Sequence, residues 1–187
     1  MANYVYIAES LDGFIATTDG GIDWLMESPN ADGEWIDETT ADGSDFGYAD
    51  FTSGIDAIVM GRNSFDKVLT FDAWPYELPV FVLSNSLTSV PDISGAEIEI
   101  TNGELKSVVS HLAERGYENL YIDGGRVIQS FLKEDLIDEM MITSIPILLG
   151  DGIPLFDKIG VVRKFRHVNT EVLGNSLVKS HFVRIRE

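Results

Sequence analysis

Short apolar runs recur along the chain and alternate with longer amphipathic or polar stretches. The runs that we expect to form strands cover residues 3–8, 56–60, 79–85, 97–100, 119–122 and 137–147. Most of them are nearly continuous in apolar residues, which is typical of strands buried on both faces of a parallel sheet. Several are separated by segments with helical periodicity, and strands that alternate with helices predict an α/β fold.

Two of the intervening segments carry clear helix signals. Residues 127–132 place their apolar side chains at helical spacing directly after a strand. Residues 104–115 form a second expected helix, and Gly116 ends it as a C-terminal glycine does. These helices would cover the faces of the sheet.

The most polar stretch of the chain is residues 27–47, which is rich in Gly, Asp, Glu and Thr. Long irregular segments inside a compact domain are usually functional or mobile. We therefore interpret part of this stretch as a flap over an active site, with a decorated surface loop as the alternative. A short helix is expected to follow, with Ser44 or Asp45 at its N-cap and an end near Ser53.

Two alternating runs close the chain. Residues 165–173 and 177–186 alternate between apolar and polar positions around a Gly-Asn-Ser turn, which predicts an antiparallel hairpin. The length of 187 residues suits one domain with a full hydrophobic core. We expect a single α/β domain over residues 1–187, with three layers and a mainly parallel sheet that ends in a C-terminal antiparallel hairpin.

The composition limits the kinds of partner. The formal net charge is −18, so nucleic acid or an anionic membrane would repel the chain at long range. No apolar run reaches membrane-spanning length, and the start of the chain lacks the basic and apolar parts of a signal peptide. The chain has no cysteine, which excludes disulfides and thiolate metal sites. We expect a cytoplasmic protein without nucleic-acid or membrane partners.

Three of the expected strands end in residues that can bind anions: Gly61-Arg62-Asn63-Ser64, Ser84-Asn85-Ser86 and Gly124-Gly125-Arg126. Glycine lets the backbone approach a ligand closely, and a following helix offers unpaired N–H groups to a phosphate. In an open parallel sheet, ligands bind at the carboxyl ends of the strands. The pattern predicts a dinucleotide site across these ends, while each turn taken alone could carry glycine only for packing.

Other common chemistries lack their motifs. The chain contains neither the Gly-x-Gly-x-x-Gly fingerprint nor a Walker lysine motif nor a Gly-x-Ser-x-Gly elbow. His111, His167 and His181 lie far apart in the sequence, and no His/Asp/Glu cluster has metal-ligand spacing. We interpret the histidines as surface or packing residues and expect no metal. What remains is chemistry carried by an organic cofactor.

These segments resemble the dihydrofolate reductase superfamily, and most closely the reductase domain at the carboxyl end of the bifunctional deaminase–reductases of riboflavin synthesis. Residues 8–16 are similar to the Ser-Leu-Asp-Gly-x-Ile-Ala opening of the riboflavin-type branch, and residues 148–156 to its Leu-x-Gly-x-Gly-x-Pro-Leu-Phe loop. Residues 59–65 resemble the family's Met-Gly-Arg-x-Ser/Thr cofactor turn. Residues 123–126 resemble its Gly-Gly turn, which often contains a cis peptide.

The resemblance implies that NADPH binds across the strand ends and transfers hydride to a pterin- or pyrimidine-like heterocycle. It also implies a homodimer. The cofactor-binding residues that it implies are Ala8, Ile15, Gly61, Arg62, Asn63, Ser64, Leu83, Ser84, Asn85, Asp123, Gly124, Gly125, Arg126 and Val127.

For catalysis the resemblance implies three residues: Asp45 as the substrate-binding carboxylate, Thr143 as its hydroxyl partner, and Trp24 behind the loop that closes over the substrate. A carboxylate that faces a pocket can bind the N–C–N edge of an aminopyrimidine and help to deliver a proton. The alternative for Asp45 is a helix cap, and Asp12 and Asp23 are rival acids.

Two other functions stay open. The enzymatic alternative is the riboflavin-pathway 5-amino-6-(5-phosphoribosylamino)uracil reductase, although the chain lacks an obvious basic patch for a ribityl phosphate. The non-enzymatic alternative is a nucleotide-binding module without turnover. Bound NADPH with no turnover of any pterin or pyrimidine would favour the module.

Overall fold

The computed structural model describes residues 1–29, 35–37, 47–173 and 176–186. Its main sheet consists of β1 (Ala2–Ser10), β5 (Ala57–Gly61), β6 (Val80–Leu83), β7 (Ile98–Thr101), β8 (Asn119–Asp123), β9 (Glu139–Ile145), β11 (Lys164–Leu173) and β12 (Leu177–Ile185). The helices are the 3₁₀ turn η1 (Asp23–Met26) and the α-helices α1 (Tyr48–Thr52), α2 (Arg62–Val68), α3 (Leu105–Glu114) and α4 (Gly125–Lys133). Smaller strands are β2 (Phe14–Ala16), β3 (Glu27–Pro29), β4 (Trp35–Asp37) and β10 (Ile153–Pro154).

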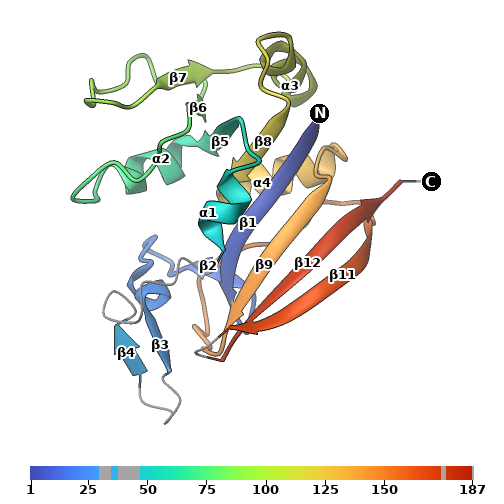
Figure 1. Ribbon diagram of the computed structural model, residues 1–187. Helices are drawn as coiled ribbons and strands as arrows, with labels where there is room; N and C mark the ends of the chain where they lie inside the picture. The colour runs from blue at the N-terminus through green and yellow to red at the C-terminus, as the bar shows by residue number, and fades with distance from the viewer. Residues whose placement is uncertain (30–34, 38–46, 174–175, 187) are drawn as a thin grey trace.

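The main sheet has eight strands in the order β11-β12-β9-β1-β8-β5-β6-β7 (Figure 1). The strands from β9 to β7 pair in parallel, whereas β12 pairs antiparallel with β9, and β11 with β12. Two short ladders, β10–β2 and β3–β4, lie outside it. The prediction of an α/β domain with a mainly parallel sheet and a C-terminal antiparallel hairpin is confirmed.

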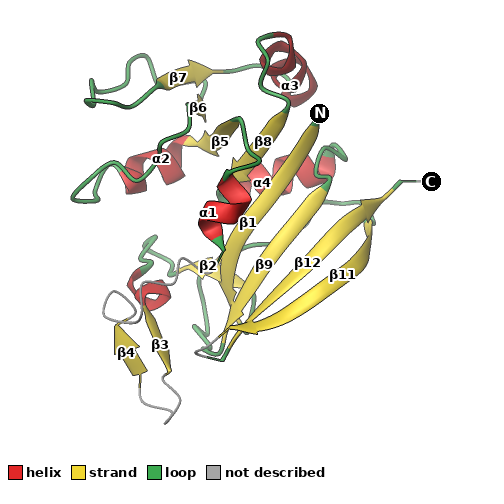
Figure 2. Cartoon of the chain, viewed as in Figure 1, coloured by secondary structure: helices red, strands yellow, loops and turns green. Residues whose placement is uncertain are grey.

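Alternating strand residues pack on opposite faces of the sheet, and helices cover both faces (Figure 2). On one face, Val59 and Ile122 belong to a core that includes residues of α3 and α4. On the other, Ile58 and Tyr121 pack with Phe65 of α2 and with aromatic residues of α1. Because β5, β6 and β8 are buried on both faces, their apolar residues form continuous runs.

Two element boundaries differ from the expectation. Helix α1 begins at Tyr48, and its N-cap is Gly47 with a φ of 87° and no side-chain cap. The expectation that Ser44 or Asp45 caps this helix is therefore wrong, and Asp45 itself lies outside the described residues. Strand β9 ends at Ile145 and not at residue 147, because Pro146 has no N–H to continue the ladder.

The helices that follow β5 and β8 leave these neighbouring strands toward opposite faces. Helix α2 places Phe65 in the core of one face, and α4 places Ile128 and Phe131 in the core of the other. In a parallel sheet this divergence opens a crevice at the carboxyl ends of the two strands. The fold therefore has a preformed place for a ligand between β5 and β8.

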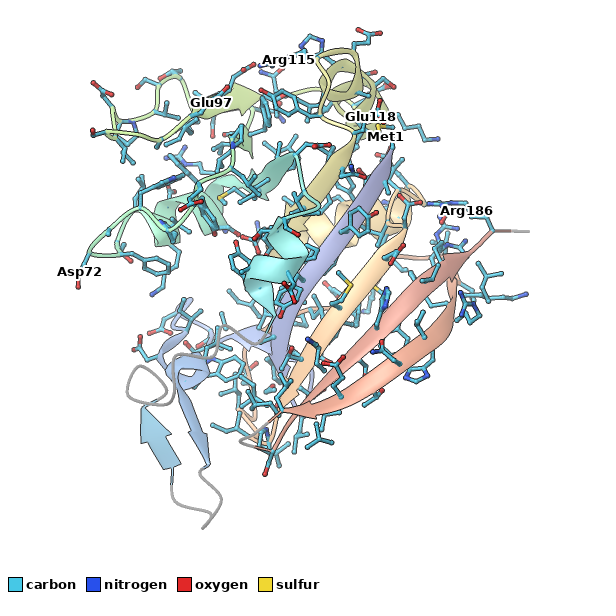
Figure 3. All side chains as sticks on the ribbon, viewed as in Figure 1. Met1, Asp72, Glu97, Arg115, Glu118 and Arg186 are labelled. Atoms are coloured by element: carbon cyan, nitrogen blue, oxygen red, sulfur yellow. The ribbon has the colours of Figure 1, made fainter. Side chains whose placement is uncertain are left out.

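The C-terminal hairpin is fastened to the turn between α4 and β9 by a carboxylate cluster. Asp135 has a φ of 62° and accepts hydrogen bonds from Arg184 Nε at 2.6 Å and Nη2 at 3.1 Å. Arg163 Nε lies 3.7 Å from the same carboxylate. Arg186, labelled in Figure 3 at the end of β12, donates to Asp138 at 2.5 Å. The hydrogen bonds from Arg184 hold the pKa of Asp135 below its ordinary value.

We expect Asp135→Asn to lower the free energy of unfolding by about 1–2 kcal/mol at neutral pH, since it removes charge-assisted hydrogen bonds at a partly exposed site. Asparagine tolerates the left-handed backbone, so the change tests the ion pairs alone. A lowered native pKa stabilises the fold above the unfolded value of about 4, and this contribution disappears as the pH falls through the native pKa.

Urea unfolding at several pH values measures this effect. The difference from the wild type should be largest near neutrality and shrink below about pH 4. The control is Asp92→Asn, which removes the same charge from an exposed loop position. An equal loss in both variants would show that the cluster contributes nothing specific.

Candidate functional site

A cleft of about 1070 Å³ runs across the carboxyl ends of β1, β5, β6 and β8. Every residue that the resemblance assigns to the cofactor, from Ala8 to Val127, lines this cleft. These residues come from segments far apart in the sequence, and the parallel sheet brings them to one edge. The residues at the predicted strand ends therefore line one cavity.

The junction between β5 and β8 is packed as closely as glycine permits. Gly124 has a φ of 88°, and a Cβ there would lie 2.1 Å from Ser64 Oγ. A Cβ on Gly61 would lie 2.9 Å from Val127 Cγ2. No peptide bond among the described residues is cis, and this includes the bond between Gly124 and Gly125.

The first turn of α4 opens beside these glycines. The helix starts at Gly125, where a Cβ would lie 2.8 Å from Ile15 Cδ1, and the helix N-terminus offers N–H groups to an anion. Arg126, in the same turn, is exposed and lines the cleft. Together with Ser64, these groups could hold the diphosphate of a dinucleotide.

Two further cations come from α2. Arg62 donates from Nη1 to Ser86 Oγ and from Nε to Asp66 Oδ2, both at 3.2 Å, so its guanidinium is held beside the strand end of β6. Lys67 also lines the cleft, and its charge helps to hold the pKa of Asp19 below the ordinary value. The cations of the cleft therefore lie on α2 and α4.

Asp123, at the end of β8, is the acid of the cleft with the most unusual surroundings. Burial raises its pKa, and no described cation forms an ion pair with it. The hydroxyl of Tyr121 donates to the backbone oxygen of Tyr6 at 2.8 Å and lies 3.4 Å from Asp123 Oδ1. A carboxyl group with a raised pKa keeps its proton at a higher pH and can donate it.

Tyrosines gather around this carboxyl group. Burial and the charge of Asp123 raise the pKa of Tyr48 to about 12, and they raise the pKa values of Tyr76 and Tyr121 further. These phenols therefore stay protonated at neutral pH. They can donate hydrogen bonds and cannot act as bases.

The two described rival acids have other surroundings. Asp12 accepts hydrogen bonds from Ser10 Oγ at 2.6 Å and from the backbone N–H of Leu149 and Gly150 at 3.2 and 2.8 Å. These bonds lower the pKa of Asp12 and tie the turn after β1 to the loop before β10. Asp23 is exposed in η1 and does not line the cleft. The two family-like segments, residues 8–16 and 148–156, are therefore held together by the hydrogen bonds of Asp12.

The predicted catalytic residues are not brought together in the described part of the cleft. Trp24 is buried in a small cluster with Ile145 and Leu177, and its Nε1 makes no hydrogen bond with a described residue. Thr143 is buried on β9, in register with Ala8. Neither lines the cleft, and Asp45 lies outside the described residues. Their catalytic roles stay predictions.

Sequence reasoning missed several residues that line the cleft. Asn102 and Gly103 follow β7, and the strand-end rule would have found them had it been applied to this strand. Tyr76 lies after α2 and carries no motif, and only the fold shows that it lines the cavity.

None of the three histidines lines the described cleft. His181 lies 2.6 Å from Glu139 on the neighbouring strand, away from the cleft. No group of three metal-ligating side chains occurs among residues 1–29, 35–37, 47–173 and 176–186. Within the same residues, no helix is long and apolar enough to cross a membrane.

The fold and cleft place the chain among dihydrofolate reductase-like proteins. It belongs to the RibD C-terminal domain family, whose model matches residues 4–179. A solved Shewanella sp. PV-4 structure, described as a "Putative riboflavin biosynthesis protein", is 45% identical over the full length of both chains, with a TM-score of 0.90. Family membership supports an oxidoreductase activity.

Two further structures share the fold at low identity. The Thermotoga maritima diaminohydroxyphosphoribosylaminopyrimidine deaminase/5-amino-6-(5-phosphoribosylamino)uracil reductase is 18% identical with a TM-score of 0.68, and the match covers 98% of this chain and 56% of that one. Dihydrofolate reductase from Enterococcus faecalis, complexed with NADP(H) and RAB-propyl, is 15% identical with a TM-score of 0.61, over 98% and 96% of the chains. The resemblance stated from the sequence is confirmed at the level of family and fold.

We expect Gly124→Ala to lower the free energy of unfolding by about 2–4 kcal/mol, because it adds backbone strain and a clash with Ser64. Gly95→Ala is the matched control, since Gly95 has a φ of 82° but nothing lies within 4 Å of its added Cβ. Thermal unfolding of both variants separates the two costs. Similar losses in both would mean that the contact with Ser64 is unimportant.

Proposed function

We propose that the protein is an NADPH-dependent reductase that acts on a pterin- or pyrimidine-like heterocycle. The observation that carries the proposal is that one cleft contains both the glycine turn at the start of α4 and a carboxyl group, that of Asp123, with a raised pKa. When bound, the nicotinamide cofactor would supply the hydride. The protein would then have to bind both molecules, exclude water and provide one proton.

The residues of the cleft fit this cofactor. The N-terminus of α4 and Ser64 suit the diphosphate, because N–H and hydroxyl groups can donate to its oxygens. Arg62 and Ser86 lie beside the end of β6, where the guanidinium suits the 2′-phosphate that distinguishes NADPH from NADH. Ile15 and Val127 offer apolar contacts between these polar groups.

Reduction of a C=N bond needs hydride at carbon and a proton at nitrogen, and Asp123 is our candidate for the proton donor. Three carboxylates line the described cleft. Asp19 has a lowered pKa, and Asp66 is already paired with Arg62 at 3.2 Å. Asp123 has a raised pKa and a tyrosine hydroxyl beside it. We assign to Asp123 the role that the resemblance implied for Asp45.

The riboflavin-type reductase reaction is the second candidate. The family membership and the reaction of the Thermotoga maritima relative favour it. The raised pKa of Asp123 argues for turnover and against a nucleotide-binding module, because a module needs no proton donor. A homodimer and a cytoplasmic location remain predictions from the resemblance and the composition.

We expect Arg62→Ala to weaken NADPH binding by about tenfold or more while NADH binding changes less than about threefold, since only NADPH carries the 2′-phosphate. Fluorescence titration of the wild type and the variant with both nucleotides measures this. Lys158→Ala, which removes a cation that does not line the cleft, is the control. Equal losses for NADPH and NADH would remove the assignment of Arg62, and failure of the wild type to bind either nucleotide would refute the proposed function.

We expect Asp123→Asn to lower kcat by about 100-fold or more with little change in NADPH affinity, because asparagine cannot give up a proton. The wild-type kcat should fall as the pH rises through the raised pKa of Asp123, and the variant should lose this dependence. The assay follows the loss of NADPH absorbance with a panel of dihydropterins and aminopyrimidines.

The matched control for this test is Asp19→Asn, which removes a carboxylate of the same cleft whose pKa is lowered. A similar loss of kcat in both variants would point to the overall charge of the cleft and not to a proton from Asp123.

A further inference from the structure

The positive charge of the cleft is confined to one wall. Arg62 and Lys67 lie on α2 and Arg126 on α4, and no other Lys, Arg or His lines the described cleft. Arg62 already pairs with Asp66 at 3.2 Å. The cleft also contains Asp19, whose pKa is lowered chiefly by a hydrogen bond from Thr17.

The opposite wall consists of β1, β2 and the loop that follows, and it has no cation. Its lining residues run from Ile7 to Leu25, and the only charged one is Asp19. The sequence extends this observation, because residues 1–61 contain no Lys, Arg or His at all. Whatever residues 30–46 contribute, they contain no basic side chain.

The phosphates of a bound NADPH would interact with the cations that line the cleft. It brings a diphosphate and a 2′-phosphate, and a phosphate monoester alone carries about −1.5 to −2 at neutral pH. A second phosphate monoester on the substrate would meet apolar residues and Asp123, whose desolvation already favours the neutral form. Transfer of such a dianion from water to this wall has no compensating ion pair.

Resting on the proposed function, we propose that the cleft selects a flat heterocycle that carries no phosphate and is neutral or cationic. The wall formed by β1, β2 and their loop gives this selectivity because it has no cation to compensate the desolvation of a phosphate. The substrate would then differ in charge from a phosphoribosyl compound such as the one named for the Thermotoga maritima relative.

The test uses two matched pairs of probes with the NADPH-saturated protein. One pair is 5-amino-6-(5-phosphoribosylamino)uracil and its phosphate-free form, and the other is dihydroneopterin and its phosphate. Calorimetric titration should show that the phosphate-free member binds at least about tenfold more tightly in each pair. Tighter or equal binding of the phosphorylated members, or binding of no probe at all, would overturn the inference.

A charge-supplying variant shows whether the wall itself sets the preference. Thr18 is exposed and lines the cleft, so Thr18→Arg should strengthen binding of the phosphorylated probes by about fivefold or more. Val162→Arg, at a position 84% exposed and outside the cleft, adds the same net charge and should not change the preference. Equal effects of both variants would contradict the role of the wall.

Titration with NADPH alone separates this inference from the proposed function. Loss of NADPH binding would refute both. Tight NADPH binding combined with a preference for phosphorylated probes would refute only the inference about the substrate.

Discussion

The close approach of the ends of β5 and β8 is the constraint on which the rest of the site depends. These parallel neighbours send their helices to opposite faces, so the crevice between them can be lined by both helix starts. This approach requires glycine at positions 61 and 124. A Cβ at Gly124 would clash with Ser64, and a Cβ at Gly61 would clash with Val127. With larger residues the strand ends would separate, and the N-terminus of α4 would move away from α2.

The fold could be predicted from the sequence because its strands are buried on both faces. Continuous apolar runs such as residues 56–60 and 119–122 identify such strands without knowledge of their partners. The start of α1 depends on backbone geometry instead. A φ of 87° at Gly47 starts α1 without the side-chain cap that Ser44 or Asp45 would have given, and the sequence does not reveal this conformation.

The strand-end residues that line the cleft could be predicted for a similar reason. The surroundings of its acidic residues could not. Groups at the ends of parallel strands must meet at one edge, so their positions in the sequence suffice. The pKa of an acid depends on neighbours that come from distant segments. Asp12 is fixed by Leu149 and Gly150, and Asp123 is surrounded by tyrosines at positions 48, 76 and 121. No local pattern distinguishes the first carboxylate from the second.

The charge distribution in the cleft is compatible with the proposed anionic cofactor, although the protein as a whole is acidic. At physiological ionic strength the Debye length is about 8 Å, so most of the 31 Asp and Glu residues are screened from a ligand in the cleft. Local groups therefore decide: Arg62 and Arg126 lie in the first turns of α2 and α4, and Lys67 lies in the last turn of α2. The same reasoning makes the opposite wall selective, because no distant lysine can replace a cation that is missing from it. In the proposed complex, the phosphates of the cofactor would lie where α4 begins, and a second phosphate at the opposite wall would meet no basic side chain.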